Sequence, residues 1–279
     1  VITRTFEEIT GKDIKHIHQV PVRFSEPEKE VYQKAISEFH AMRGNYFAST
    51  GNSRKDSMMR LIQQITLLLR ISAAPNTVKE YTGGMPVKIA KVMEMLQEMP
   101  DQIIAIGVRH KKVVDAYTAA IRKLMPERPL FVVTGDTTTL AQRRKLRKTL
   151  KASGNGILLC TQQSLPSSVN FEFVNKVIIP ELHYNNSRMS QFYMRFVRYT
   201  SREDKDIYFV TYLGSIESNQ MQMVLAKEKI NLFMRGQEQD LDDIYKTFGV
   251  DYNLLETLMR REENSEGVFE IRWGKQDIS

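Results

Sequence analysis

The stretch QIIAIGVRHKKVVDAYTAAIRKLMPERPLFVVTG, from Gln102 to Gly135, decides the fold class of this chain. It begins with a short apolar run that ends at Gly107 and closes with a second apolar run that starts at Leu130. Between the two runs, residues 110–125 carry apolar side chains at the spacing of one face of a helix. Two continuous apolar strands joined by a helix are typical of a parallel sheet that is covered on both faces.

The same alternation extends along the middle of the chain, where short apolar runs are separated by helical patterns. Further strands are expected over 156–161, 176–180 and 207–212. Further helices are expected over 86–98, 138–152 and 188–198. The pattern predicts an α/β fold with a doubly wound, mainly parallel sheet and helices on both faces. Ligands of such sheets bind at the carboxyl ends of the strands, so the loops that follow the strands are the candidate site.

Three regions of the chain differ in character. Residues 85–236 are expected to form the α/β domain, here called the lobe. Residues 1–84 are expected to be a mostly helical lead-in to it, and residues 237–279 a C-terminal helical extension. In the first region, Val20–Phe24 alternates like a strand, and Ser25 and Glu28 form a capping box for the helix that follows. After the lobe's last strand, helices are expected over 215–235, 240–248 and 251–261, and a strand over 268–273.

The lead-in is expected to contain two helices. The first runs from the capping box to about Met42, and the second covers residues 54–72. The residues between them, 44–52, are expected to form a loop, and a polar linker closes the lead-in at Gly83 and Gly84.

The composition narrows the classes of partner and compartment. The 279 residues carry a formal net charge of +7, which favours a polyanionic partner such as nucleic acid, although a soluble protein can be basic for other reasons. Cys160 is the single cysteine, so a disulfide within the chain is excluded. A cytoplasmic location is therefore expected, or a nucleoid-associated one, and a nuclear one if the protein is eukaryotic. No apolar run approaches the roughly 20 residues that span a bilayer. The first residue is Val1 and not Met, so we expect a piece of a longer protein.

Several sequence motifs of common enzymes are absent. The chain contains no G-x-x-x-x-G-K-[ST], no G-x-G-x-x-G and no H-E-x-x-H. This excludes a self-contained P-loop ATPase and a standard dinucleotide enzyme. The spacing of His16 and His18 is interpreted as a surface pair and not as a metal site, so no metal is expected.

Three strand-end loops carry basic or hydroxyl residues. Gly107–Lys112 opens a helix and offers an anion site, although a solvated charge run fits the same residues. Thr134–Thr139 opens a strongly basic helix, and Thr161–Leu165 follows the third strand. Together they predict a track for the backbone of a nucleic acid. The candidate nucleic-acid contacts are Arg109, His110, Lys111, Thr134, Gly135, Arg143, Thr161 and Gln162.

The order of these motifs resembles the second RecA-like lobe of superfamily 2 helicases and, more closely, that of the SNF2-like (SWI2/SNF2) ATPases. The resemblance runs from about Val20 to Met234 and includes a lysine-bearing helix around Lys88. The segments that carry it are Gln102–Tyr117 (motif IV), Val133–Arg143, Ile157–Phe171 (motif V), Gln191–Arg198 (motif VI, QxxxRxxR) and Lys205–Glu217. Pro166 and Ser168 stand where the family usually has two glycines, which puts tight phosphate contact by that loop in doubt.

The resemblance implies a division of labour between two lobes. The first lobe of the family holds the nucleotide, and Arg195 and Arg198 would act on its phosphates as arginine fingers. Gln191 and Asn170 would also contact the nucleotide. ATP and Mg²⁺ would then bind only when an N-terminal RecA-like lobe, in the same or another chain, completes the site. The implied polymer is DNA, with RNA possible. The structural alternative is a surface on which Arg198 and Arg202 pair with neighbouring carboxylates.

Three hypotheses about function follow. The first is the C-terminal lobe of an ATP-dependent DNA translocase or helicase, inactive alone because it lacks the P-loop. The second is a free-standing nucleic-acid-binding module without ATPase activity, which the residues Pro166 and Ser168 favour. The third is a nuclease component fused to such a lobe, but no cluster of carboxylates supports it.

Overall fold

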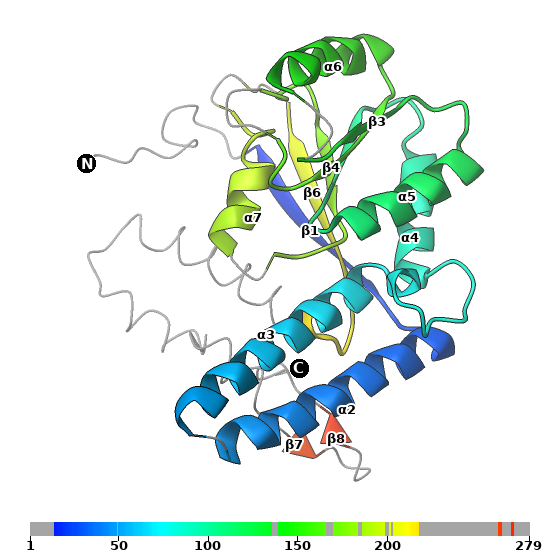
Figure 1. Ribbon diagram of the computed structural model, residues 1–279. Coiled ribbons are helices and arrows are strands. Elements are labelled where there is room, and N and C mark those ends of the chain that lie inside the picture. The colour runs from blue at the N-terminus through cyan, green and yellow to red at the C-terminus, as the bar shows by residue number, and fades with distance from the viewer. Residues whose placement is uncertain are drawn as a thin grey trace.

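The computed structural model describes residues 14–48, 50–135, 139–165, 170–183, 186–198, 201, 203–217, 262–263 and 269–270. Its centre is a six-stranded, entirely parallel sheet with the strand order β1-β6-β5-β2-β4-β3 (Figure 1). The strands are β1 (Lys15–Val22), β2 (Ile104–Val108), β3 (Leu130–Val133), β4 (Ile157–Thr161), β5 (Lys176–Ile179) and β6 (Lys205–Tyr212). The prediction of a doubly wound α/β fold is confirmed.

The direction in which strands are added reverses at β2. From β2 the chain passes to β3 and returns to β4 on one side, and then crosses to β5 and β6 on the other side. The loops after β2 and β5 therefore leave neighbouring strands in opposite directions, which is the topological switch point where ligands of such sheets bind.

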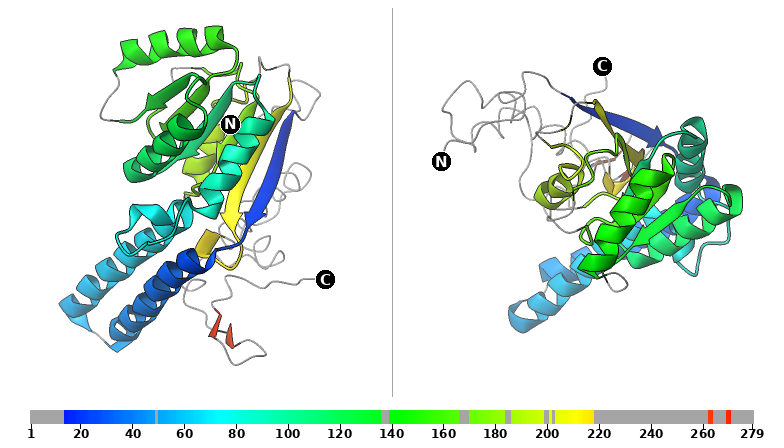
Figure 2. Two further views of the ribbon diagram at one scale, coloured as in Figure 1. Left: turned by 90° about the vertical axis from the view of Figure 1, so that its right-hand side faces the viewer. Right: turned by 90° about the horizontal axis from the view of Figure 1, so that it is seen from above.

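Helices cover both faces of the sheet, as Figures 1 and 2 show. On one face lie α4 (Val87–Glu98) and α5 (Lys111–Leu124), and on the other lie α6 (Leu140–Ser153) and α7 (Asn186–Tyr193). The side chains of β2 alternate between them: Ile104 and Ile106 pack in the core with α4 and α5, whereas Ala105 belongs to the core under α6 and α7. Continuous apolar runs are therefore needed, because neither face meets water.

Two long helices extend from one end of the sheet (Figure 1 and the left view of Figure 2). They are α2 (Glu26–Ala48) and α3 (Gly51–Ala73), followed by the short 3₁₀ helix η1 (Pro75–Thr77), and they share their own apolar core. The expected loop over 44–52 is wrong, because helix α2 continues to Ala48 and α3 already begins at Gly51. Packing between the two helices outweighs the poor helix propensity of the residues around Gly44.

Strand β1 was predicted in the wrong place. It covers Lys15–Val22, ends before Phe24, and pairs in parallel with β6 at the edge of the sheet. The sheet of the lobe thus takes a strand from the segment that the sequence indicates as a helical lead-in. Most side chains of β1 are exposed or half-buried, so the apolar signal of a buried strand is missing there.

The C-terminal predictions fall mostly outside the described residues. The helix expected from residue 215 is described only up to Glu217, and the expected helices over 240–248 and 251–261 lie outside the described part. Two short strands, β7 (Glu262–Glu263) and β8 (Phe269–Glu270), pair antiparallel, and β8 lies within the strand expected over 268–273. No helix within the described ranges is long and apolar enough to cross a membrane.

Candidate functional site

A buried carboxylate occupies the switch point of the sheet. Glu181 follows β5, is 1% exposed, and accepts hydrogen bonds from the backbone N–H groups of Arg109 (2.6 Å) and His110 (3.1 Å) through Oε2. Its other oxygen contacts His110 Nδ1. The N-terminus of α5 thus has an anion already, supplied by the protein itself. This corrects the interpretation of Gly107–Lys112 as an open anion site, since Glu181, which sequence reasoning missed, takes the backbone donors of Arg109 and His110.

Gln162 is also part of the interior at this point. Its side chain is 4% exposed, and its amide Nε2 donates to the backbone oxygens of Gly107 (3.2 Å) and Glu181 (2.7 Å). Its own N–H donates to Val108 O at 2.7 Å. The residue thereby joins the ends of β2, β4 and the β5 loop. This corrects its assignment as a nucleic-acid contact, because its donors are used within the lobe.

The loops after β3 and β4 lie side by side. A Cβ built on the exposed Gly135 would lie 3.8 Å from Ser164 Oγ, and that hydroxyl contacts the Thr161 hydroxyl. Thr161 is half-buried, whereas Thr134 is buried. Of these predicted contacts, Gly135 and Thr161 therefore meet solvent, together with the exposed Lys111 at the start of α5.

The motif VI arginines do not share a helix. Helix α7 ends at Tyr193, and the next turn is held by hydrogen bonds from Arg195 N to Phe192 O (3.1 Å) and from Phe196 N to Tyr193 O (3.0 Å). Such bonds to the third preceding residue tighten the end of a helix. The expectation that one face of a helix presents Arg195 and Arg198 is therefore wrong, since both lie on the segment that follows α7. Gln191 is exposed on α7 itself.

The guanidinium of Arg195 is only partly satisfied. Its Nε and Nη1 atoms are buried and make no hydrogen bond to any residue that the structure describes. Burial lowers the pKa of Arg195, and the nearby charge of Arg198 lowers it further. Buried donors without a partner are rare and costly in proteins, and two neighbouring cations attract an anion. The arrangement can therefore take an oxyanion such as a phosphate.

Asn170 and Arg143 belong to the side of the lobe under α6. The amide of Asn170 contacts the carboxylate of Glu172, and its backbone oxygen accepts from Arg147 Nε. Arg143 is half-buried in α6, and its Nε has no hydrogen-bond partner within the described residues. No sequence motif links Asn170 to Glu172, because their contact depends on the local turn before β5.

A second polar cluster joins the sheet to the helical pair. Lys88 Nζ lies 2.5 Å from Glu217 Oε2 and donates to Pro180 O at 3.1 Å, and neither side chain is more than 1% exposed. Glu217 Oε2 also accepts from Tyr212 N at 3.0 Å. Burial raises the pKa of Glu217 to about 7 against the opposing attraction of Lys88, and burial lowers the pKa of Lys88.

The cluster continues to the start of α2. Glu28 is completely buried, and its Oε1 accepts from Tyr212 Oη and from the backbone N–H of Val87, both at 2.7 Å. Its Oε2 accepts from Ser25 N at 2.6 Å, which completes the Glu half of the predicted capping box. Glu28, Lys88 and Glu217 come from three distant parts of the sequence and fix α2, α4 and the end of β6 to one another. Their role is structural.

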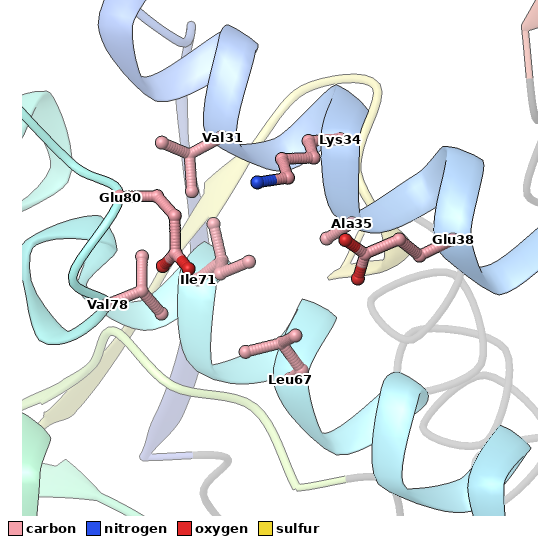
Figure 3. Close-up of a pocket in the computed structure, with 8 residues that line it drawn as sticks. All are labelled: Val31, Lys34, Ala35, Glu38, Leu67, Ile71, Val78 and Glu80. Atoms are coloured by element: carbon pink, nitrogen blue, oxygen red, sulfur yellow. The ribbon is translucent and has the colours of Figure 1, made fainter.

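A pocket lies between the helices of the lead-in (Figure 3). Aliphatic side chains of α2 and α3 line it, with three charged side chains around them. The lining residues are Val31, Lys34, Ala35, Glu38, Leu67, Ile71, Val78 and Glu80. It is separate from the residues considered above.

The strand order and the position of the candidate residues at the carboxyl ends of the strands define a RecA-like lobe. Solved structures share this fold. The C-terminal part of the Fun30 ATPase domain matches with a TM-score of 0.61 at 15% identity, covering 75% of this chain and 89% of that one. The C-terminal domain of the Sulfolobus solfataricus SWI2/SNF2 ATPase matches with a TM-score of 0.59 at 16% identity, covering 85% and 99%. The fold is therefore that of SWI2/SNF2 C-terminal domains.

A longer structure gives the same result. The Sulfolobus solfataricus SWI2/SNF2 ATPase core in complex with double-stranded DNA matches with a TM-score of 0.62 at 17% identity, covering 84% of this chain and 50% of that one. The chain thus spans about half the length of that core. No protein-family model matches the sequence, and no curated protein matches it either.

Proposed function

We propose that this chain is the C-terminal lobe of an ATP-dependent DNA translocase of the SWI2/SNF2 type. The observation that carries the proposal is Arg195, whose buried, unsatisfied donors lie beside Arg198 in a lobe of this fold. The lobe would supply these two arginines to a nucleotide held by an N-terminal RecA-like lobe. The sequence has no P-loop, so this chain would hydrolyse no ATP alone.

The arginines suit phosphoryl transfer for physical reasons. A guanidinium stays charged, is planar and binds two phosphate oxygens at once. It stabilises the charge that builds on the phosphoryl oxygens during transfer. Arg195 and Arg198 would approach the β- and γ-phosphates when the two lobes close, and the exposed Gln191 would contact the partner lobe or the nucleotide. Asn170 would have to give up its contact with Glu172 to reach the nucleotide.

The proposed polymer is DNA, and the support is the Sulfolobus core solved with double-stranded DNA. The solvent-accessible candidates Gly135, Thr161 and Lys111 would contact the phosphates of one strand. Arg109 and His110 lie at the same edge, where Glu181 accepts hydrogen bonds from both backbone N–H groups, and the Arg109 side chain would add positive charge.

The test is DNA-stimulated ATP hydrolysis by the lobe joined to a first lobe, in the same or a second chain. Arg195→Ala and Arg198→Ala are each expected to lower kcat by about 1,000-fold or more, the usual contribution of an arginine finger, with duplex affinity unchanged. Arg122→Ala removes an exposed arginine from α5 and is the matched control. Normal hydrolysis in either motif VI variant would contradict the proposed role of that arginine.

A second candidate is a nucleic-acid-binding module without ATPase activity. Pro166 and Ser168 favour it, because they stand where the SNF2-like family usually has two glycines in the motif V loop. In that case the joined protein would bind duplex DNA but would not hydrolyse ATP in its presence.

A further inference from the structure

Helix α6 has the most one-sided charge of any helix in the lobe. Its sequence, LAQRRKLRKTLKAS, has six basic residues in 14 positions and no acidic one. The basic residues are Arg143, Arg144, Lys145, Arg147, Lys148 and Lys151. Helix α5, which has the same length, includes Asp115 among its basic residues.

The helix divides these residues between two faces. Leu146 and Leu150 pack against the sheet, whereas Arg144, Lys145 and Lys148 are exposed. Within the described part of the chain, no carboxylate forms an ion pair with any of these three cations. A face of this kind repels like charge and needs counterions from solvent or from a partner.

Lys151 is exposed as well, and Arg147 fixes the helix in place. Arg147 contacts Asn170 O, lies 3.7 Å from Glu172 Oε1, and stacks over Phe173 at 5.4 Å. Lys151 Nζ lies 5.8 Å from the centre of the same ring. Glu172, the nearby acid, is therefore committed to Arg147 and Asn170, and the outer face keeps its full charge.

The spacing of the outer cations fits a nucleic-acid backbone. Arg144, Lys148 and Lys151 stand at i, i+4 and i+7, so they form one row about 10 Å long on the helix. One strand of duplex DNA presents a phosphate about every 3.4 Å along the axis, so this row faces roughly three phosphates. Helix α6 begins at Leu140, five residues after Gly135 in the sequence, and lies at the end of the molecule opposite α2 and α3 (Figure 1).

We propose that the exposed face of α6 is a second binding surface for the phosphate backbone of duplex DNA, continuous with the strand-end loops. The proposal rests on the proposed DNA partner but not on ATP hydrolysis. It commits to nucleic acid because a regular row of exposed cations gives charge complementarity to evenly spaced phosphates.

The test compares two charge-matched triple variants of the full chain. R144Q/K148Q/K151Q neutralises the row on α6, and K79Q/R122Q/K123Q removes three exposed charges elsewhere, two of them from α5 on the opposite face of the sheet. Affinity for a fluorescent 20-base-pair duplex is measured from 50 to 200 mM salt. Loss of three phosphate contacts is expected to reduce the slope of log K against log salt by about 2.7, whereas the control slope stays within about 0.5 of the parent. Circular dichroism confirms that both variants fold.

The outcomes separate this inference from the proposed function. An equal fall in slope for both triple variants, or no fall in either, overturns the α6 surface. The proposed DNA partner is still supported in that case, provided that the parent chain binds the duplex. No duplex binding by the parent chain overturns both. Equal affinity of the parent for poly-glutamate of the same charge contradicts a nucleic-acid partner for this face and points to an acidic protein.

Discussion

Replacing Lys88 by methionine would leave the Glu217 carboxylate buried without its cation. Both side chains are nearly inaccessible, and Lys88 Nζ also donates to Pro180 O, so the variant loses a charge partner and a hydrogen bond together. Breaking a buried ion pair by removing one member costs about 3–5 kcal/mol. We therefore expect Lys88→Met to lower the free energy of unfolding by about that amount at pH 8, measured by urea denaturation.

The cost is expected to depend on pH, because Glu217 can take up a proton. Its pKa is raised in the folded chain from 4.5 to about 7, so the folded state holds more protons than the unfolded chain between those values. Stability from this group is therefore fully present below about pH 4.5 and is lost as pH rises through about 7, by roughly 3 kcal/mol in total. Glu217→Gln should flatten this part of the pH profile.

The double variant Lys88→Met/Glu217→Leu supplies the control. A buried pair replaced by apolar groups is often neutral, so the double variant should recover much of the stability that the single variant loses. A loss below about 1 kcal/mol in Lys88→Met, an equal loss at pH 5 and pH 8, or a double variant no more stable than the single one would refute the reasoning.

Two further predictions concern other buried or half-buried contacts. Arg128 donates to four backbone oxygens, those of Leu96, Met99, Gln102 and Asn155. Arg128→Ala is therefore expected to lower stability by about 2–3 kcal/mol in thermal unfolding, and Arg128→Lys to recover less than half of that loss because lysine cannot reach all four oxygens. A full rescue by lysine would contradict this geometry. Glu181→Gln should lower stability by about 1–3 kcal/mol, because it weakens the charge-assisted hydrogen bonds at the start of α5. It should also tighten duplex binding, because it removes a negative charge beside Arg109 and His110. Weaker duplex binding in a folded variant would argue against a phosphate path at this loop.

The parallel sheet could be predicted because its strands carry their own signal. The runs ending near Ile106, Val133 and Cys160 are apolar at every position, and only a strand covered on both faces requires this. Strand β1 lacks that signal because most of its side chains are exposed or half-buried, as at His16 and His18. The sequence therefore indicated five strands, including the edge strand β3, and misplaced β1 at the other edge.

The candidate site was less predictable because burial of a polar group depends on residues far away in the sequence. Gln162 and Glu181 follow strands, as ligand-binding residues often do, but the Gln162 amide donates to backbone oxygens of the lobe and the Glu181 carboxylate accepts from the backbone after β2. The end of α7 before Arg195 likewise depends on how Phe192 and Phe196 pack, with ring centroids 5.4 Å apart. Neither result follows from residue type or spacing.

The charge of the nearest ionised neighbour distinguishes Lys88 from Arg195 among the motif residues. Lys88 and Glu217 carry the family resemblance as clearly as Arg195, but they are partners of each other inside the lobe. Arg195 keeps two buried donors without a partner among the described residues, and a second arginine lies close to it. A folded lobe tolerates that cost where a ligand relieves it, and functional sites are the places where such cost is retained. Lys88, which is paired with a buried carboxylate, therefore helps to hold the lobe together, whereas Arg195, which lies beside a like charge, is positioned to act on an anion.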